Sequence, residues 1–215
     1  MWQTFTYYSI LTLEAVVGFF GVRLYEGSTY KVLNRLDAGI EIRSYGPRVA
    51  AEVTLPRAFE AGRNEAFRLL FDYIAGANQG PNGERSRIAM TVPVESREET
   101  RIAMTVPVYT EQQGGHVRMR FSLPASYTLA TSPVPDDDRV QIVEIASELI
   151  AAKRFSGRAL DSDVDVKKAE LISALEMSEW QHVSDPYTLF YDAPFTLPIL
   201  RRNEVAVAVE RRNGR

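Results

Sequence analysis

The sequence predicts an α+β fold made of two successive halves, each ordered strand, strand, helix, strand, strand. Short runs rich in β-branched residues alternate with two segments whose apolar residues recur at helical spacing. Part of this pattern returns one hundred residues later, where Ile40-Glu41-Ile42 is answered by Val140-Gln141-Ile142 and Val49-Ala50-Ala51 by Leu149-Ile150-Ala151. We therefore expect the strands to form one sheet or barrel, with the two helices packed outside.

The first half begins with three predicted strands and continues into the best helical segment of the chain. The strands are expected at 30–33, 40–45 and 48–55, with a turn at 37–39 between the first two. A helix is expected at 57–77, where apolar residues recur three or four positions apart. These residues are Phe59, Ala66, Leu70 and Tyr73, flanked by Phe67, Phe71 and Ile74.

An exact repeat follows this helix, because the octapeptide RIAMTVPV occurs at 87–94 and again at 101–108. Each copy is rich in β-formers and predicts a short strand, and its proline lacks an amide donor and belongs where strand pairing stops. The repeat is compatible with a duplicated hairpin arm, or with a soft apolar pocket lined by Met90 and Met104. A Gly-Gly turn and a strand at 116–123 come next.

The second half follows a polar connector at 133–138. A second helix is expected at 164–177, and acidic residues just ahead of it are explained by capping and by the helix dipole. Extended segments are expected at 182–191 and 205–210. We expect Arg201, Arg202 and Glu204 to form an ion-pair network where the chain enters the last strand.

Composition excludes several classes of site. The 215 residues are 45% hydrophobic and 25% charged, and their net charge of −3 offers no field for attracting nucleic acid. The chain has no cysteine, which excludes thiol nucleophiles, disulfides and covalent c-type haem attachment. Its two histidines, His116 and His182, are too few for a three-histidine metal centre.

The N-terminal residues 1–24 form an apolar segment ahead of a domain at 25–215, whose halves lie at about 25–130 and 139–215. Residues 5–22 approach the ~20 residues that cross a bilayer, which suggests membrane association through this segment. Glu14 weakens a spanning helix, and a helix docked on the domain or on a partner is the alternative. If the segment spans, the basic residues that follow it place the body on the cytoplasmic side.

The chain resembles the SOUL/haem-binding protein family over roughly 21–210. The matching segments are YKVL at 30–33, IEIRSY at 40–45 with Pro47-Arg48, AFRLLFDYI at 66–74, IAMTVPV at 102–108, RFSLP at 120–124 and YDAPFTLPILRRNEV at 191–205. The resemblance implies a distorted β-barrel of about eight strands with two flanking helices. It also implies noncovalent binding of haem or another tetrapyrrole in a shallow apolar groove, without established catalytic residues.

The same resemblance suggests which residues line that groove. On the first helix they are Phe67, Leu70, Phe71 and Ile74, near Met104 on the repeated strand. Arg63 or Arg68 is suited to a haem propionate, because guanidinium pairs bidentately with carboxylate. His116 or His182 is the candidate iron ligand. The alternative is that the apolar residues belong to the core and the arginines are solvated.

Three functions remain open from the sequence. The first is a tetrapyrrole-binding protein that buffers, transports or senses haem without converting it. The second is an enzyme that acts on a tetrapyrrole, although the sequence contains neither a phosphate-binding glycine motif nor a nucleophile elbow. The third is an effector-type ligand- or protein-interaction domain that binds no haem.

Overall fold

The computed structural model describes residues 26–56, 59–99, 116–192 and 196–212, which fold into two compact units. The first unit contains Met1–Ser44 together with Leu149–Arg215, and the second contains Tyr45–Glu148. The chain therefore passes from the first unit to the second and back again.

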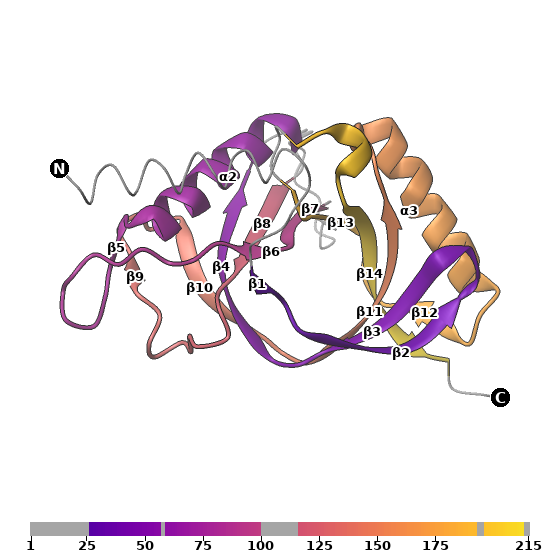
Figure 1. Cartoon of the computed structure of the whole chain (residues 1–215), viewed down its shortest axis with the longest axis horizontal. Helices are drawn as coiled ribbons and strands as arrows, with labels where there is room; N and C mark the ends of the chain where they lie inside the picture. Colours follow the sequence, from indigo (N-terminus) through magenta and orange to yellow (C-terminus); the bar gives the residue numbers. More distant parts are fainter. Residues whose placement is uncertain (1–25, 57–58, 100–115, 193–195, 213–215) are drawn as a thin grey trace, which may run out of the picture. The chain divides into compact units, whose positions relative to one another are not determined.

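The second unit is an antiparallel sheet with one helix. Its main strands lie in the order β10-β4-β8-β7, and α2 lies alongside β4 and β8 (Figure 1). The elements are β4 (Arg48–Leu55), α2 (Phe59–Ala75), β5 (Asn78–Gln79), β6 (Thr91–Val92), β7 (Val94–Glu99), β8 (His116–Ser122), β9 (Val134–Pro135) and β10 (Val140–Ile145).

Strand β8 shows how this sheet divides into two faces. Val117, Met119 and Phe121 are buried, whereas the residues between them are partly exposed. This alternation follows from the two-residue period of a strand. Arg120 on the polar face binds Glu52 of β4 at 2.5 Å and Glu95 of β7 at 3.2 Å.

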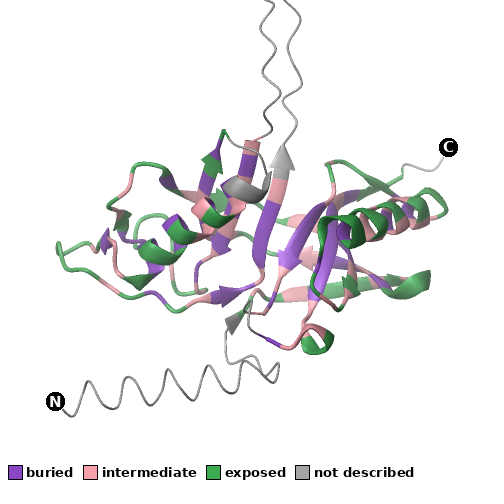
Figure 2. Ribbon diagram, turned by 90° about the horizontal axis from the view of Figure 1, so that it is seen from above, coloured by how far each residue is buried: buried purple, intermediate pink, exposed green. Residues whose placement is uncertain are grey.

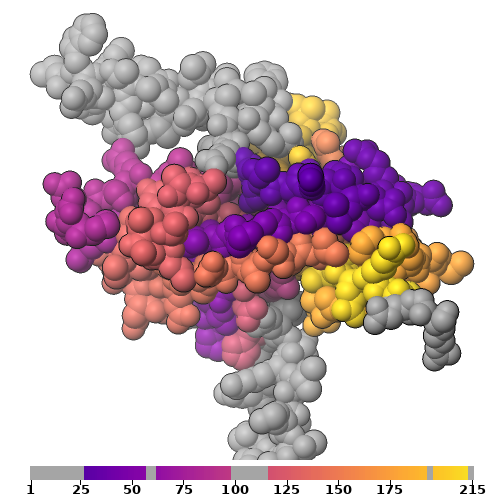
Figure 3. Space-filling model, turned by 90° about the horizontal axis from the view of Figure 1, so that it is seen from below, coloured from indigo at the N-terminus to yellow at the C-terminus, as the bar shows by residue number. Residues whose placement is uncertain are grey.

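The first unit is also an antiparallel sheet with one helix. Its strands lie in the order β13-β14-β11-β3-β2, and β12 pairs with β14. Strand β2 is therefore an edge strand, and the first described residues are prominent on the surface (Figure 3). The elements are β1 (Glu26–Gly27), β2 (Tyr30–Leu36), η1 (Asp37–Gly39), β3 (Ile40–Tyr45), β11 (Glu148–Phe155), α3 (Asp161–Glu176), β12 (Trp180–His182), β13 (Tyr187–Phe190), η2 (Pro198–Leu200) and β14 (Asn203–Arg211).

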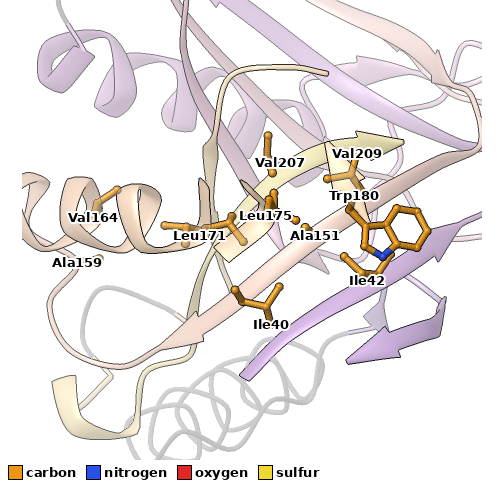
Figure 4. Packing of buried hydrophobic residues seen from close by; sticks show 11 residues of the cluster. Ile40, Ile42, Ala151, Ala159, Val164, Leu171, Leu175, Trp180, Val207 and Val209 are labelled. Atoms are coloured by element: carbon orange, nitrogen blue, oxygen red, sulfur yellow. The ribbon is translucent and has the colours of Figure 1, made fainter. Parts of the chain in front are cut away.

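The core of the first unit lies between α3 and its sheet (Figure 4). Leu171 and Leu175 of α3 are at most 1% exposed and pack with apolar residues of four strands. Their partners include Ile40, Ile42, Ala151, Trp180, Val205, Val207 and Val209. Both helices keep many exposed residues (Figure 2), as expected when one helical stripe covers a sheet.

The predicted α+β class is confirmed, with antiparallel strands and a helix in each unit. The expected one-hundred-residue offset is present in the strand bounds, since β3 corresponds to β10 and β4 to β11. However, the compact units do not follow the two sequence halves. Strand β10 pairs with β4 in the second unit, and β3 pairs with β11 in the first, so the halves exchange a strand.

The predicted elements differ from the observed ones mainly at their ends. Helix α2 is shorter than the segment at 57–77, and α3 begins at Asp161, so that Asp161 and Asp163 lie inside its first turn. The first octapeptide forms a strand only at Thr91–Val92 and from Val94 onward, with Pro93 between them. The second copy at 101–108 lies outside the described residues.

No helix in the described part of the chain is both long enough and apolar enough to cross a membrane. The apolar segment at 1–24, for which membrane association is predicted, lies outside those residues. A membrane anchor there stays a prediction.

Candidate functional site

Helix α2 has a buried side and an exposed side. Its buried side is formed by Ala66, Leu69, Leu70, Tyr73 and Ile74, none of which is more than 7% exposed. Phe71 departs from this pattern, because it is a large apolar side chain that is 47% exposed. An exposed phenylalanine on a helix that already has a complete buried side is a candidate contact for an apolar ligand.

Three phenylalanines form a row that leads from the surface into the second unit. The rings of Phe71 and Phe67 stack with centroids 6.1 Å apart and planes inclined by 14°. Phe67 then meets Phe121 of β8 edge to face at 5.4 Å, and Phe121 is 1% exposed. We call these residues the aromatic row. Its geometry is that of favourable aromatic pairs, so Phe71 is held in place by contacts that continue into the core.

Two of the predicted groove residues are core residues. Leu70 is fully buried and Ile74 is 6% exposed, so both lie on the buried side of α2. Phe67 and Phe71 remain as the predicted residues closest to the surface. Helical spacing does not distinguish the core pair, Leu70 and Ile74, from Phe67 and Phe71, because all four positions occupy one continuous arc of the helix.

The predicted arginines occupy the same region of α2. Arg63 precedes Phe67 by four residues and is half-buried, and it already takes part in an interaction. Arg68 is exposed and precedes Phe71 by three residues, a spacing that makes them neighbours on a helix surface. Arg68 is thus the better placed of the two to meet an acidic group at the exposed end of the aromatic row.

The predicted iron ligands are not equivalent. His116 is half-buried at the start of β8, in the same unit as α2. His182 is exposed on β12 of the first unit, where its Nδ1 lies 3.3 Å from the carbonyl oxygen of Ser184. Met104 lies outside the described residues. Within the described ranges, no group of three or more metal-binding side chains is present.

Tyr73 lies on the buried side of α2 and is 1% exposed. Its hydroxyl is buried and donates to the carbonyl oxygen of Pro133 at 3.0 Å. Burial, with a smaller contribution from Tyr127, raises the pKa of Tyr73 to about 12. The Tyr73 hydroxyl therefore makes a hydrogen bond inside the second unit, at the end of the buried side of α2.

Sequence reasoning did not identify Phe121 as a neighbour of the helix residues. The only available signal was the alternation of arginine and apolar residues from Arg118 to Phe121, which assigns Phe121 to the buried face. The contact with Phe67 depends on how α2 crosses the sheet, and no local pattern specifies that.

Comparisons with known proteins identify the family of this chain. Residues 25–208 match the family model described as "SOUL heme-binding protein". The chain is 30% identical over 188 residues to "Heme-binding protein 1" of Xenopus laevis, covering 86% of this chain and 91% of that protein. It is 28% identical over 164 residues to "Heme-binding protein 1" of Sus scrofa, covering 74% and 77% of the two chains.

A more distant likeness concerns the fold alone. The structure is similar to that of a conserved protein from Listeria innocua, with a TM-score of 0.59 at 12% identity over 80% of this chain and 93% of that one. The family assignment depends on the sequence matches, which span almost all of the described chain. On that basis, the chain belongs to the SOUL haem-binding protein family.

Proposed function

We propose that this protein binds haem or a related tetrapyrrole noncovalently at the exposed end of the aromatic row. The observation that carries the proposal is the exposure of Phe71, 47%, together with its stacking on Phe67. A porphyrin is a flat apolar macrocycle, and aromatic contacts contribute about 0.5–1.5 kcal/mol beyond the burial of apolar area. Family membership favours this ligand class over other flat apolar molecules.

The arginines of α2 supply the second element of recognition. Haem carries two propionates, and a guanidinium at Arg68 beside Phe71 suits a carboxylate at the rim of the macrocycle. Arg63, on the same stripe as Phe67, is available to a second carboxylate if its present partner is exchanged.

Iron coordination is secondary in this proposal. His116 is the candidate ligand that belongs to the same unit as α2, while apolar contact and ion pairing supply most of the affinity. Bound haem contributes its own redox chemistry, and the protein residues hold the ring and its acidic groups. Binding of this kind is exchangeable, which suits buffering, transport or sensing of haem rather than its conversion.

Titration with hemin tests the proposal. We expect the unaltered chain to give a saturable shift of the Soret band. Phe71→Asp should raise the Kd by about tenfold or more, because a loss of about 1.4 kcal/mol of binding free energy corresponds to a factor of ten. The matched control is Val166→Asp on α3, because Val166 is 56% exposed and belongs to the first unit. This control should leave the Kd unchanged.

The outcomes are distinct. A nonsaturating titration of the unaltered chain would refute haem binding. Equal Kd values for the unaltered chain and Phe71→Asp would show that haem binds elsewhere than at the aromatic row. Circular dichroism of each variant verifies that the fold is retained, and chromatography of the recovered porphyrin separates binding from conversion.

A further inference from the structure

The first octapeptide occupies a defined position in the second unit. Ile88 is 5% exposed, and its amide donates to the carbonyl oxygen of Ile74 at 2.9 Å. Thr91, Val92 and Val94 are each at most 6% exposed, and the Thr91 hydroxyl donates to the carbonyl oxygen of Ser122. We call the position filled by residues 87–94 the octapeptide site.

The second octapeptide carries every side chain that the octapeptide site uses. Ile102, Thr105, Val106 and Val108 repeat Ile88, Thr91, Val92 and Val94 in order, fourteen positions later. Identical residues in an identical environment make the same contacts. The octapeptides themselves therefore give the chain no basis for preferring one copy over the other, and only the flanking residues can distinguish them.

The residues that follow each copy are both compatible with the neighbouring strand. In the structure, β7 runs from Val94 to Glu99 beside β8, with Glu99 opposite His116, so that residues 100–115 connect the two strands. A shift of fourteen residues puts Val108–Gln113 in place of β7 and leaves Gly114-Gly115 between Gln113 and His116. A two-residue Gly-Gly loop is a favoured connection for a hairpin.

The side-chain pairs between this strand and β8 also favour neither the observed nor the shifted register. The observed register places Arg97 opposite Arg118, a pair of like charges, whereas the shifted one places Glu111 there. Against this, Glu95 accepts hydrogen bonds from Arg97 at 2.6 Å and from Arg120 at 3.2 Å, and Tyr109 would replace it.

On the buried side of the strand, the shifted register fits at least as well as the observed one. Ser96 is 1% exposed, and its hydroxyl has no hydrogen-bond partner in the described part of the molecule. Thr110 would replace it, and Val-Tyr-Thr is a better β-forming sequence than Val-Glu-Ser.

We propose that the two octapeptides compete for the octapeptide site, so that residues 94–99 and 108–113 alternately form the strand beside β8. Register is set by the residues that fill the buried positions, and here two segments fill them equally. The exchange transfers fourteen residues from the connection between β7 and β8 to the connection between α2 and that strand. The protein thereby has two native arrangements of one hairpin.

A pair of equal deletions fixes each arrangement. Removing residues 87–100 joins Ser86 to Arg101 and keeps the second copy with its Gly-Gly turn, while removing 101–114 keeps the first copy and leaves Thr100-Gly115 as the turn. Both variants lose fourteen residues and one octapeptide. Because either copy fills the octapeptide site, we expect both variants to fold.

Methyl NMR of Met119 then reports the register in the full chain, because Met119 is opposite Ser96 in one arrangement and opposite Thr110 in the other. We expect either two Met119 signals matching the two deletion variants or one signal averaged between them. A single signal that coincides with one variant alone would overturn the proposal.

Disulfide trapping provides a second test that needs no deletion, since the chain has no cysteine of its own. Glu95→Cys with Arg120→Cys reports the observed register, and Tyr109→Cys with Arg120→Cys reports the shifted one. The control pair is Tyr109→Cys with Ser122→Cys, which neither register places opposite each other. Crosslinking of the Tyr109/Arg120 pair that is no faster than the control would also overturn the proposal.

Discussion

Individual residues of the first unit show how burial and charge are balanced in this protein. Glu204 is fully buried and accepts hydrogen bonds from Arg43 at 2.6 and 3.0 Å, from Arg202 at 2.6 and 2.9 Å and from the Tyr191 hydroxyl at 2.7 Å. Burial alone raises the pKa of Glu204, but the hydrogen bonds and charge of Arg43, with those of Arg202, outweigh it. The pKa of Glu204 therefore lies below its ordinary 4.5 in the folded protein.

Glu204→Gln tests the contribution of this carboxylate to stability. We expect the free energy of unfolding at pH 7 to fall by about 3 kcal/mol, because the buried Arg43 and the half-buried Arg202 lose the charge of Glu204. Glu210→Gln on the same strand is the control, since Glu210 is exposed, and it should cost less than about 1 kcal/mol. Urea denaturation measures both.

The pH dependence has a definite sign. A carboxyl whose pKa is lower in the folded state stabilises the protein above its unfolded pKa, near 4.5, and this contribution is lost as the pH falls through the folded pKa. The stability of the unaltered protein should therefore fall more steeply below pH 4.5 than that of Glu204→Gln. Parallel curves for the two proteins would contradict the low pKa of Glu204.

The sequence predicted part of this ion-pair network around Glu204. The ion pair between Arg202 and Glu204 was expected from their proximity in the chain and is confirmed. Arg43 was not expected, because it lies 161 residues from Glu204 and reaches it only once β3 has joined the sheet. Contacts between residues distant in sequence depend on strand order, which local patterns do not contain.

At the scale of elements, α2 illustrates what periodicity can and cannot predict. Its apolar spacing predicted a helix and a wide apolar arc correctly. The arc is wider than the contact with the sheet, and so Leu70 is buried while Phe71 is exposed. The exposed part of this arc, at Phe71, is where we propose that the ligand binds.

Alanine substitutions at these two adjacent positions should separate packing from binding. Leu70→Ala removes a fully buried side chain and should lower the free energy of unfolding by about 2–5 kcal/mol. Phe71→Ala should cost little stability and should weaken hemin binding. Thermal denaturation and hemin titration of both variants check this, and a large loss of stability in Phe71→Ala would assign Phe71 to the core.

Strand β7 is an element that local sequence patterns do not predict. Its sequence, VESREE, is rich in charged residues with low β-propensity, and the strand predicted for the first octapeptide was expected to end at Val94. It forms because Glu95 and Arg97 pair with groups on the polar face while β8 supplies the ladder. Tertiary pairing overrides local propensity in this segment.

At the scale of the whole molecule, the repeated pattern predicted which elements correspond but not which strands pair. The bounds of β3 and β10, and of β4 and β11, differ by one hundred residues as expected. Yet each compact unit takes strands from both halves. An equal offset between strand bounds does not specify strand pairing, because a strand can bury its apolar face by pairing within its own half or with the other half.

Fluorine NMR with hemin shows most directly where a tetrapyrrole binds to this protein. Ferric haem broadens the signals of nuclei close to it, and ten fluorinated phenylalanines report from both units. We predict that substoichiometric hemin broadens the signals of Phe71 and Phe67 first, while those of Phe155 and Phe190 in the first unit stay sharp. Broadening of Phe155 or Phe190 with a sharp Phe71 signal would contradict the proposed site.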